Sequence, residues 1–173
     1  MFLPLAEAEA LDMTPRLVVA IFRSRGGTMK RAGNNPKRRI APANRLTAAQ
    51  KAALAKKVAY VASGHHKRFP ADYGLERTGP RPTKSLCDIL RIIPLNEAKS
   101  MIQKGIWNGM VSEHFFGEYP KYIWCVGEDD EVYEAKTDAV TPGTYHGYRL
   151  EEEDNMREHV KQAWKERCQP TGR

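Results

Sequence analysis

The chain has 173 residues, of which 41% are hydrophobic and 28% are charged, and its formal net charge is +7. The length indicates one domain of roughly 150 residues with room for a tail. The composition excludes collagen, a coiled coil and disorder of the whole chain. No apolar run reaches the ~20 residues that a membrane-spanning helix needs.

The positive charge is concentrated in the first half of the chain. Residues 1–86 contain 17 Lys and Arg against 5 Asp and Glu, whereas residues 87–173 contain 11 against 16. Between Met13 and Ala71 there are 14 basic residues and no acidic one. A long stretch of one sign is typical of a surface that binds a polyanion, with nucleic acid as the first candidate.

The N-terminal part of the chain has the composition of a linker. Residues 24–46 are rich in Gly, Pro, Asn, Lys and Arg, which predicts a mobile basic segment. We therefore expect a basic, partly disordered arm over residues 1–46 and a folded domain over residues 47–173. No function is placed on residues 1–28.

Helical signals follow at two places. Thr47 and Gln50 match a capping box, so a helix should begin there and end near Ser63–Gly64. Asn96 is a candidate N-cap for a second, amphipathic helix with an apolar stripe. Between these helices, Ser85–Ile93 is apolar enough for a short buried helix or strand. The stripe of the second helix consists of Ala98, Met101, Ile102 and Ile106.

The remaining elements are predicted strands and a last helix. Residues 121–136 contain two β-type runs around a polar turn and predict a hairpin. Residues 144–150 could add a third strand, and Glu151–Arg167 has the charge pattern of a helix. The fold class expected is therefore α+β: a short antiparallel sheet flanked by helices and preceded by a flexible basic arm.

Two short runs contain candidate chemistry. In Ser63–Arg68, His65 and His66 stand beside two cations, and a neutral imidazole can act as a general base. In Thr144–Arg149, alternation along a strand places His146 and Tyr148 on one face and Tyr145 on the other. A solvated turn and an ordinary edge strand are the structural alternatives for these two runs.

The cysteines and histidines do not suggest a metal site. Cys87, Cys125 and Cys168 are far apart in the sequence, and the histidines do not combine with them at the spacing of a zinc finger. We therefore expect free thiols in a cytoplasmic protein, no metal and no cofactor.

Several short pieces resemble small uncharacterised bacterial proteins. The resemblance covers residues 58–166 and implies a bacterial or phage setting, but it carries no activity. The pieces are Ser63-x-x-His66-Lys67, Pro70-x-Asp72-Tyr73-Gly74, Arg81-Pro82-x-Lys84-x-Leu86-Cys87-Asp88, Tyr133-Glu134-Ala135 and Tyr145-His146-Gly147-Tyr148.

Three functions remain open from the sequence. The first is nucleic-acid binding, with RNA favoured over DNA. The second is a small, toxin-like ribonuclease that needs no metal, with His66 and His146 as acid and base and with His65 and Tyr148 as further candidates. The third is an adaptor whose basic arm binds an acidic protein. The residues predicted to bind nucleic acid are Lys37, Arg38, Arg39, Arg45, Lys56, Lys57, Lys67, Arg68, Arg81, Lys84, Tyr145 and Arg149.

Overall fold

A computed structural model describes residues 35–76, 86 and 88–168 of the chain. Its elements, in chain order, are η2 (Pro36–Arg38), α1 (Ala48–Lys57), β1 (Ala59–Tyr60), η3 (Gly64–His66), η4 (Pro70–Tyr73), α2 (Leu95–Trp107), β2 (Phe115–Phe116), β3 (Tyr119–Pro120), β4 (Tyr122–Val126), β5 (Val132–Lys136), β6 (Thr144–Arg149) and α3 (Met156–Cys168). The predicted α+β class is confirmed.

The main sheet has four strands in the order β1-β6-β5-β4. The predicted hairpin is present as β4 and β5, paired from Tyr122 with Lys136 to Val126 with Val132. β6 is the predicted third strand and runs antiparallel to β5. The sequence did not predict β1, a two-residue strand parallel to β6, or the separate small sheet of β2 and β3.

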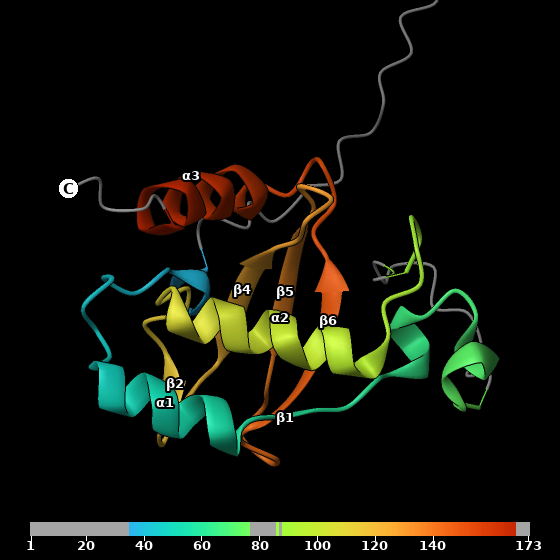
Figure 1. The fold of residues 1–173 in the computed structure, drawn as a ribbon, viewed down its shortest axis with the longest axis horizontal. Coiled ribbons are helices and arrows are strands. Elements are labelled where there is room, and N and C mark those ends of the chain that lie inside the picture. The colour runs from blue at the N-terminus through green and yellow to red at the C-terminus, as the bar shows by residue number, and fades with distance from the viewer. Residues whose placement is uncertain (1–34, 77–85, 87, 169–173) are drawn as a thin grey trace, which may run out of the picture.

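Alternating side chains of the sheet contribute to cores on its two faces. In Figure 1, α2 crosses in front of β4, β5 and β6, and α3 lies above them. Ile123 and its neighbours on one face pack against α1 and α2. Trp124 and Val132 on the other face pack with Met156 and Val160 of α3. Helices far apart in the sequence therefore cover opposite faces of β4. Removing the helix from either face would expose a hydrophobic core.

Helix α1 begins as predicted and ends earlier than predicted. Thr47 and Gln50 form a capping box in which each side chain accepts a hydrogen bond from the backbone N–H of the other residue. The helix ends at Lys57, because Val58 is extended and leads into β1. The apolar spacing continues to Val61, but Val61 lies beyond β1 and is 53% exposed, so this spacing does not mark a helix face and Ser63–Gly64 is not the end of a helix.

The other two helices also differ from their predicted boundaries. Helix α2 begins at Leu95 with Pro94 as the N-cap, so Asn96 lies inside its first turn. Proline fits this end of a helix because it lacks the N–H that would be unsatisfied there. Helix α3 begins at Met156, whose N–H donates to the carboxylate of Asp154, and not at Glu151.

The part of the predicted linker that the structure describes is packed into the domain. Ala41 is fully buried, and its N–H donates to the carbonyl of Val111. Ile40 forms a β-bridge with Ser112. The prediction of a mobile linker is therefore wrong for residues 35–46, because these residues complete the core beside β4; residues 1–34 lie outside the described residues.

Candidate functional site

A buried carboxylate lies at the centre of the face that α3 partly covers. Glu134 on β5 is fully buried and accepts hydrogen bonds from Trp124 Nε1 at 2.8 Å and from the hydroxyl of Tyr148. The guanidinium of Arg38 donates to the same carboxylate at 2.8 and 3.0 Å, and to Asp154 at 2.9 Å. Burial opposes the charge of Arg38, but the two carboxylates outweigh it and raise its pKa.

This cluster changes the interpretation of Arg38. The sequence predicted a nucleic-acid contact at this position, but the guanidinium donates its hydrogen bonds to two carboxylates of its own chain. A buried ion pair of this kind orients the segment that carries the arginine. We therefore assign Arg38 to the attachment of residues 35–46 on the sheet.

The predicted catalytic pair stays a prediction, because the structure describes the side chain of only one of its members. In the cross-strand register His146 stands opposite Lys136, and Tyr148 stands opposite Glu134. Burial, the charge of Glu134 and the hydrogen bond to it together raise the pKa of Tyr148. The side chain of His66 lies outside the described part of the structure, so an approach of His66 to His146 stays a prediction.

Two further residues of the predicted surface are buried. Tyr145 is fully buried, and its hydroxyl donates to the carbonyl of Pro120, so its ring is not available as a stacking surface. Arg149 is 8% exposed and donates to Glu131 at 2.9 Å and to Glu151 at 2.7 Å. The sequence predicted both residues to be surface groups, because alternation along a strand does not show which face of the sheet is covered.

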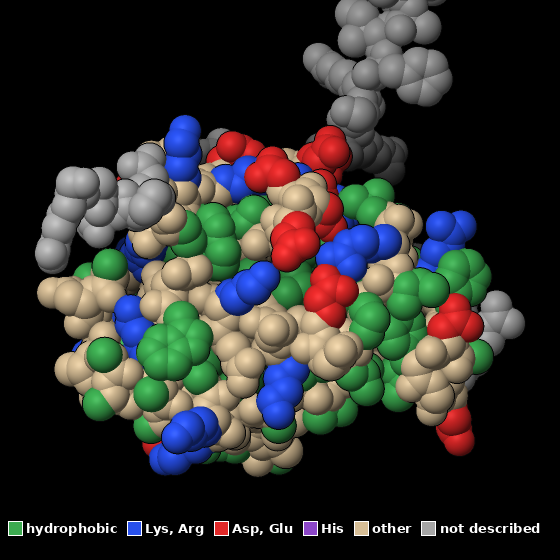
Figure 2. Space-filling model, viewed as in Figure 1, with side chains coloured by type: hydrophobic (Ala, Val, Ile, Leu, Met, Phe, Trp, Pro, Cys, Tyr) green, Lys and Arg blue, Asp and Glu red, His purple; other side chains and the backbone are tan. Residues whose placement is uncertain are grey.

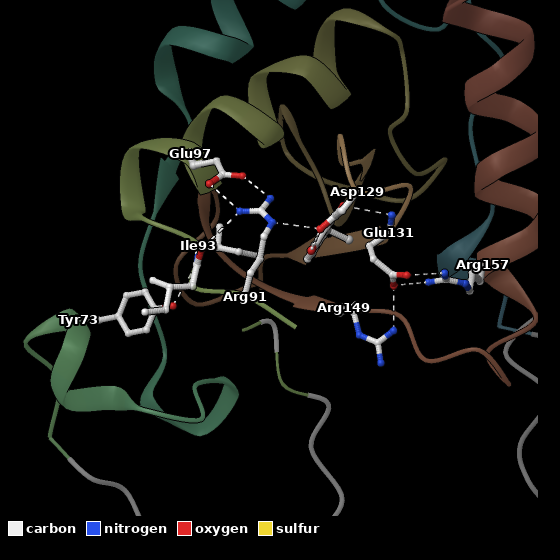
Figure 3. A network of polar contacts seen from close by, with 10 residues as sticks. Tyr73, Arg91, Ile93, Glu97, Asp129, Glu131, Arg149 and Arg157 are labelled. Carbon is white, nitrogen blue, oxygen red and sulfur yellow. Dashed lines mark hydrogen bonds and ion pairs between the residues drawn. The ribbon is translucent and has the colours of Figure 1, made fainter. Parts of the chain in front are cut away.

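Glu131 joins the end of β6 to α3. Arg149 and Arg157 both donate to its carboxylate, as Figure 3 shows. The hydrogen bond from Arg157 opposes the effect of burial, and with Arg149 it lowers the pKa of Glu131 to about 2. These contacts stabilise the fold. They also occupy both terminal nitrogens of each guanidinium, which are then not available for a phosphate.

Arg91 connects the start of α2 to the β4–β5 turn. It donates to Glu97 at 2.5 and 3.0 Å and to Asp129 at 3.1 Å (Figure 3). Asp129 also accepts a hydrogen bond from the hydroxyl of Tyr133. A cleft of about 670 Å³ lies beside this network, and Lys104 at its rim lies 3.6 Å from Glu128. The cleft is thus lined by charges that already pair with each other.

A lobe beside the sheet unites several pieces that the sequence analysis singled out. We define the lobe as residues 61–76, 86 and 88–93. These residues contain the 3-10 helices η3 and η4 but no β-strand and no α-helix. Lys67 is buried against the ring of Tyr73, and the N–H of Arg68 donates to Asp88 at 2.7 Å. Ser85–Ile93 was predicted to be a helix or strand; its described residues are irregular, with Leu90 and Ile92 exposed.

The other predicted cations are exposed, and they differ in their surroundings. Lys57 pairs with Glu118 at 2.7 Å, and Arg45 lies over the ring of Phe115 at 5.4 Å. Arg81 and Lys84 lie outside the described residues. Of the cations predicted to bind nucleic acid, those exposed in the structure are Lys37, Arg39, Arg45, Lys56, Lys57 and Arg68.

An exposed tryptophan lies among lysines on the outer face of α1 and α2. The two helices are antiparallel neighbours, because Lys51 reaches the carbonyl of Trp107 and Gln103 reaches the carbonyl of Ala55. Figure 2 shows basic side chains around hydrophobic ones on this face, with acidic side chains gathered toward the β4–β5 turn.

The outward positions of α2 place the lysines on both sides of Trp107. At 3.6 residues per turn, Lys99 and Lys104 flank the direction in which Trp107 points. Trp107 is 51% exposed, and both lysines are exposed. We call Lys56, Lys99, Lys104 and Trp107 the helical face.

The described residues were compared with the requirements of a metal site and of a membrane-spanning helix. Among them, no group of three His, Cys, Asp or Glu side chains could hold a metal ion, and no helix is long and apolar enough to cross a membrane. Cys125 and Cys168 are free thiols, and burial raises the pKa of Cys125 to about 12.

Comparison with known proteins gives no relative. No family model, no curated protein and no solved structure matches the chain. Any function must therefore be argued from the residues themselves.

Sequence reasoning missed the residues of α2 that lie on the helical face. Basic residues are dense in the first half of the chain, whereas Lys99 and Lys104 stand in the more acidic second half, where charge density does not single them out. A usable signal was present: Trp107 falls outside the apolar stripe of α2, and a residue on the polar side of an amphipathic helix is expected to be exposed.

Proposed function

We propose that the protein binds single-stranded RNA on the helical face. The observation that carries the proposal is the half-exposed ring of Trp107 between Lys99 and Lys104. Proteins bind single strands by stacking bases on aromatic rings and by placing cations along the phosphates. The helical face provides one stacking surface and three cations, of which Lys104 also lies 3.6 Å from the exposed carboxylate of Glu128.

The charges around the helical face support this assignment. Helix α1 contains no acidic residue, and the one acidic residue of α2, Glu97, is engaged by Arg91. Lys51 is held at the end of α2 by its contact with the carbonyl of Trp107. Lys56 and Lys99 have exposed side chains for phosphate oxygens, which bind cations in a way that depends on salt.

The test is a titration of a fluorescently labelled single-stranded RNA with the full chain, followed by anisotropy. Trp107→Ala should weaken binding by roughly 1–3 kcal/mol, the range for loss of one stacked base. Trp107→Phe retains a ring and should recover part of the loss. Tight binding by both wild type and Trp107→Ala would overturn the assignment of the site.

The same samples decide between RNA binding and the two other functions. Cleavage of the RNA in EDTA that is lost in His146→Ala would establish a metal-independent ribonuclease. Binding only to an acidic protein, retained after nuclease treatment, would favour an adaptor. Equal affinity for single-stranded RNA and DNA would keep the helical face and remove the preference for RNA.

A further inference from the structure

The lobe contains an unusual concentration of buried polar atoms without partners. Five buried side-chain nitrogen or oxygen atoms in the described residues accept or donate no hydrogen bond, and three of them lie in the lobe. They are Nδ1 of His65, Nζ of Lys67 and Oδ2 of Asp88. Native proteins leave few such atoms, so a cluster of three calls for a physical explanation.

The cation of the cluster has a ring beneath it and no acceptor. Lys67 is 4% exposed, and its Nζ lies 3.8 Å from the centroid of the Tyr73 ring. The hydroxyl of Tyr73 is fixed in turn, since it accepts from the backbone N–H of Ile93 at 3.1 Å. The ring stabilises the ammonium on one side, but the three N–H groups of Lys67 find no oxygen among the described residues.

Only one of the two carboxylate oxygens of Asp88 accepts a hydrogen bond. Oδ1 of Asp88 accepts from the N–H of Arg68 at 2.7 Å, while Oδ2 has no donor. Asp88 is 5% exposed, yet within the described residues no ion pair of 4.0 Å or less joins it to Lys67. An ammonium and a carboxylate group are therefore buried in one lobe without a direct ion pair between them, which is costly unless a third group completes their hydrogen bonds.

We propose that this third group is a phosphate that keeps one protonated oxygen, either free phosphate or a phosphate monoester. Its unprotonated oxygens can accept from Lys67, and its P–OH can donate to Oδ2 of Asp88. A carboxylate next to an anion is otherwise repulsive, so Asp88 selects for a ligand that can donate. Sulfate has no proton to donate near neutral pH, and an internal phosphodiester has none either.

The site does not depend on RNA binding at the helical face, and its residues lie on other elements. The lobe consists of 3-10 turns and irregular chain, which open locally at lower free energy than a sheet or an α-helix. Such local opening provides the route by which a small anion reaches buried atoms.

The test compares the thermal unfolding of the full chain in sodium phosphate and in sodium sulfate at equal ionic strength and pH 6.5, where every inorganic phosphate ion carries at least one proton. Phosphate should raise the unfolding midpoint in a saturable manner, and sulfate should raise it much less. Equal responses to the two anions, or none to phosphate, would overturn the proposal and leave water as the group that completes the cluster.

Two variants and one control sharpen the comparison. Lys67→Met should abolish the phosphate response, whereas Lys165→Met, at an exposed lysine of α3 outside the lobe and the helical face, should retain it. Asp88→Asn keeps the acceptor for Arg68 and replaces Oδ2 with a donor, so it should lower the preference for phosphate over sulfate at least tenfold. Because Asp88→Asn preserves the backbone contact, it also keeps the test decisive if Lys67→Met does not fold. An unchanged preference in Asp88→Asn would contradict the proposal.

The source of the phosphate is decided by a second titration. Inorganic phosphate and adenosine 5′-monophosphate should both shift the midpoint if the site binds the phosphate group alone, and adenosine should not. A shift by adenosine as large as that by its monophosphate would place the ligand elsewhere and overturn the proposal. Trp107→Ala should leave the phosphate response unchanged even if it abolishes RNA binding.

Discussion

Arg38 and Lys57 are both basic residues of the first half of the chain, but they differ in what they contact. Arg38→Met removes the partner of a fully buried carboxylate and should lower the free energy of unfolding by about 3–5 kcal/mol. Lys57→Met breaks only the exposed ion pair with Glu118 and should change the free energy of unfolding little. Urea unfolding of the two variants is the measurement, and adding Glu134→Gln to Arg38→Met should recover part of the loss. Equal effects of the two single variants would contradict the assignment of Arg38.

Glu131 predicts how the fold responds to acid. Its pKa of about 2 in the folded chain lies below the ordinary value of 4.5, so its contribution is fully present above about pH 4.5 and is lost as the pH falls toward 2. The difference in unfolding free energy between wild type and Glu131→Gln should therefore be largest near pH 6 and shrink in acid. A difference that stays constant from pH 6 to pH 2 would show that Arg149 and Arg157 do not lower this pKa.

At the scale of elements, the contact between α2 and β4 depends on a glycine. A Cβ on Gly105 would lie 2.4 Å from the carbonyl oxygen of Trp124, so Gly105→Ala must push the helix away from the strand. We expect a loss of about 1–3 kcal/mol, despite a gain of about 1 kcal/mol in helix propensity. Ser100→Ala, on the outer side of the same helix, should cause no loss in the same thermal or urea unfolding experiment. Stabilisation by Gly105→Ala would contradict the close packing.

The elements that the sequence predicted well are those with local signals. The capping box at Thr47, the apolar stripe of α2 and the polar turn between β4 and β5 each act over a few residues, and the structure confirms them. The helix end at Lys57 and the strand β1 depend on pairing with Thr144 and Tyr145, more than 80 residues away, which local pattern cannot reveal. Arg38 was misread for the same reason, since its carboxylate partners lie 96 and 116 residues further along the chain.

At the scale of the whole molecule, the described residues are almost neutral. They contain 19 Lys and Arg and 18 Asp and Glu, so the excess positive charge belongs to the remaining residues. The helical face should therefore contribute a limited and measurable part of the salt dependence of RNA binding. Lys99→Met with Lys104→Met should reduce the slope of log affinity against log salt by roughly 1.4, about 0.7 per phosphate contact. An unchanged slope would place the phosphate contacts on other residues.

The most direct test of RNA binding at the helical face compares two exposed aromatic residues. Trp107 and Phe69 are 51% and 53% exposed, and Phe69 lies in the lobe beneath Arg68. In one anisotropy titration with single-stranded RNA, Trp107→Ala should weaken binding at least fivefold, and Phe69→Ala should leave it unchanged. Loss of binding in Phe69→Ala with full affinity in Trp107→Ala would contradict the account and place the RNA on the lobe.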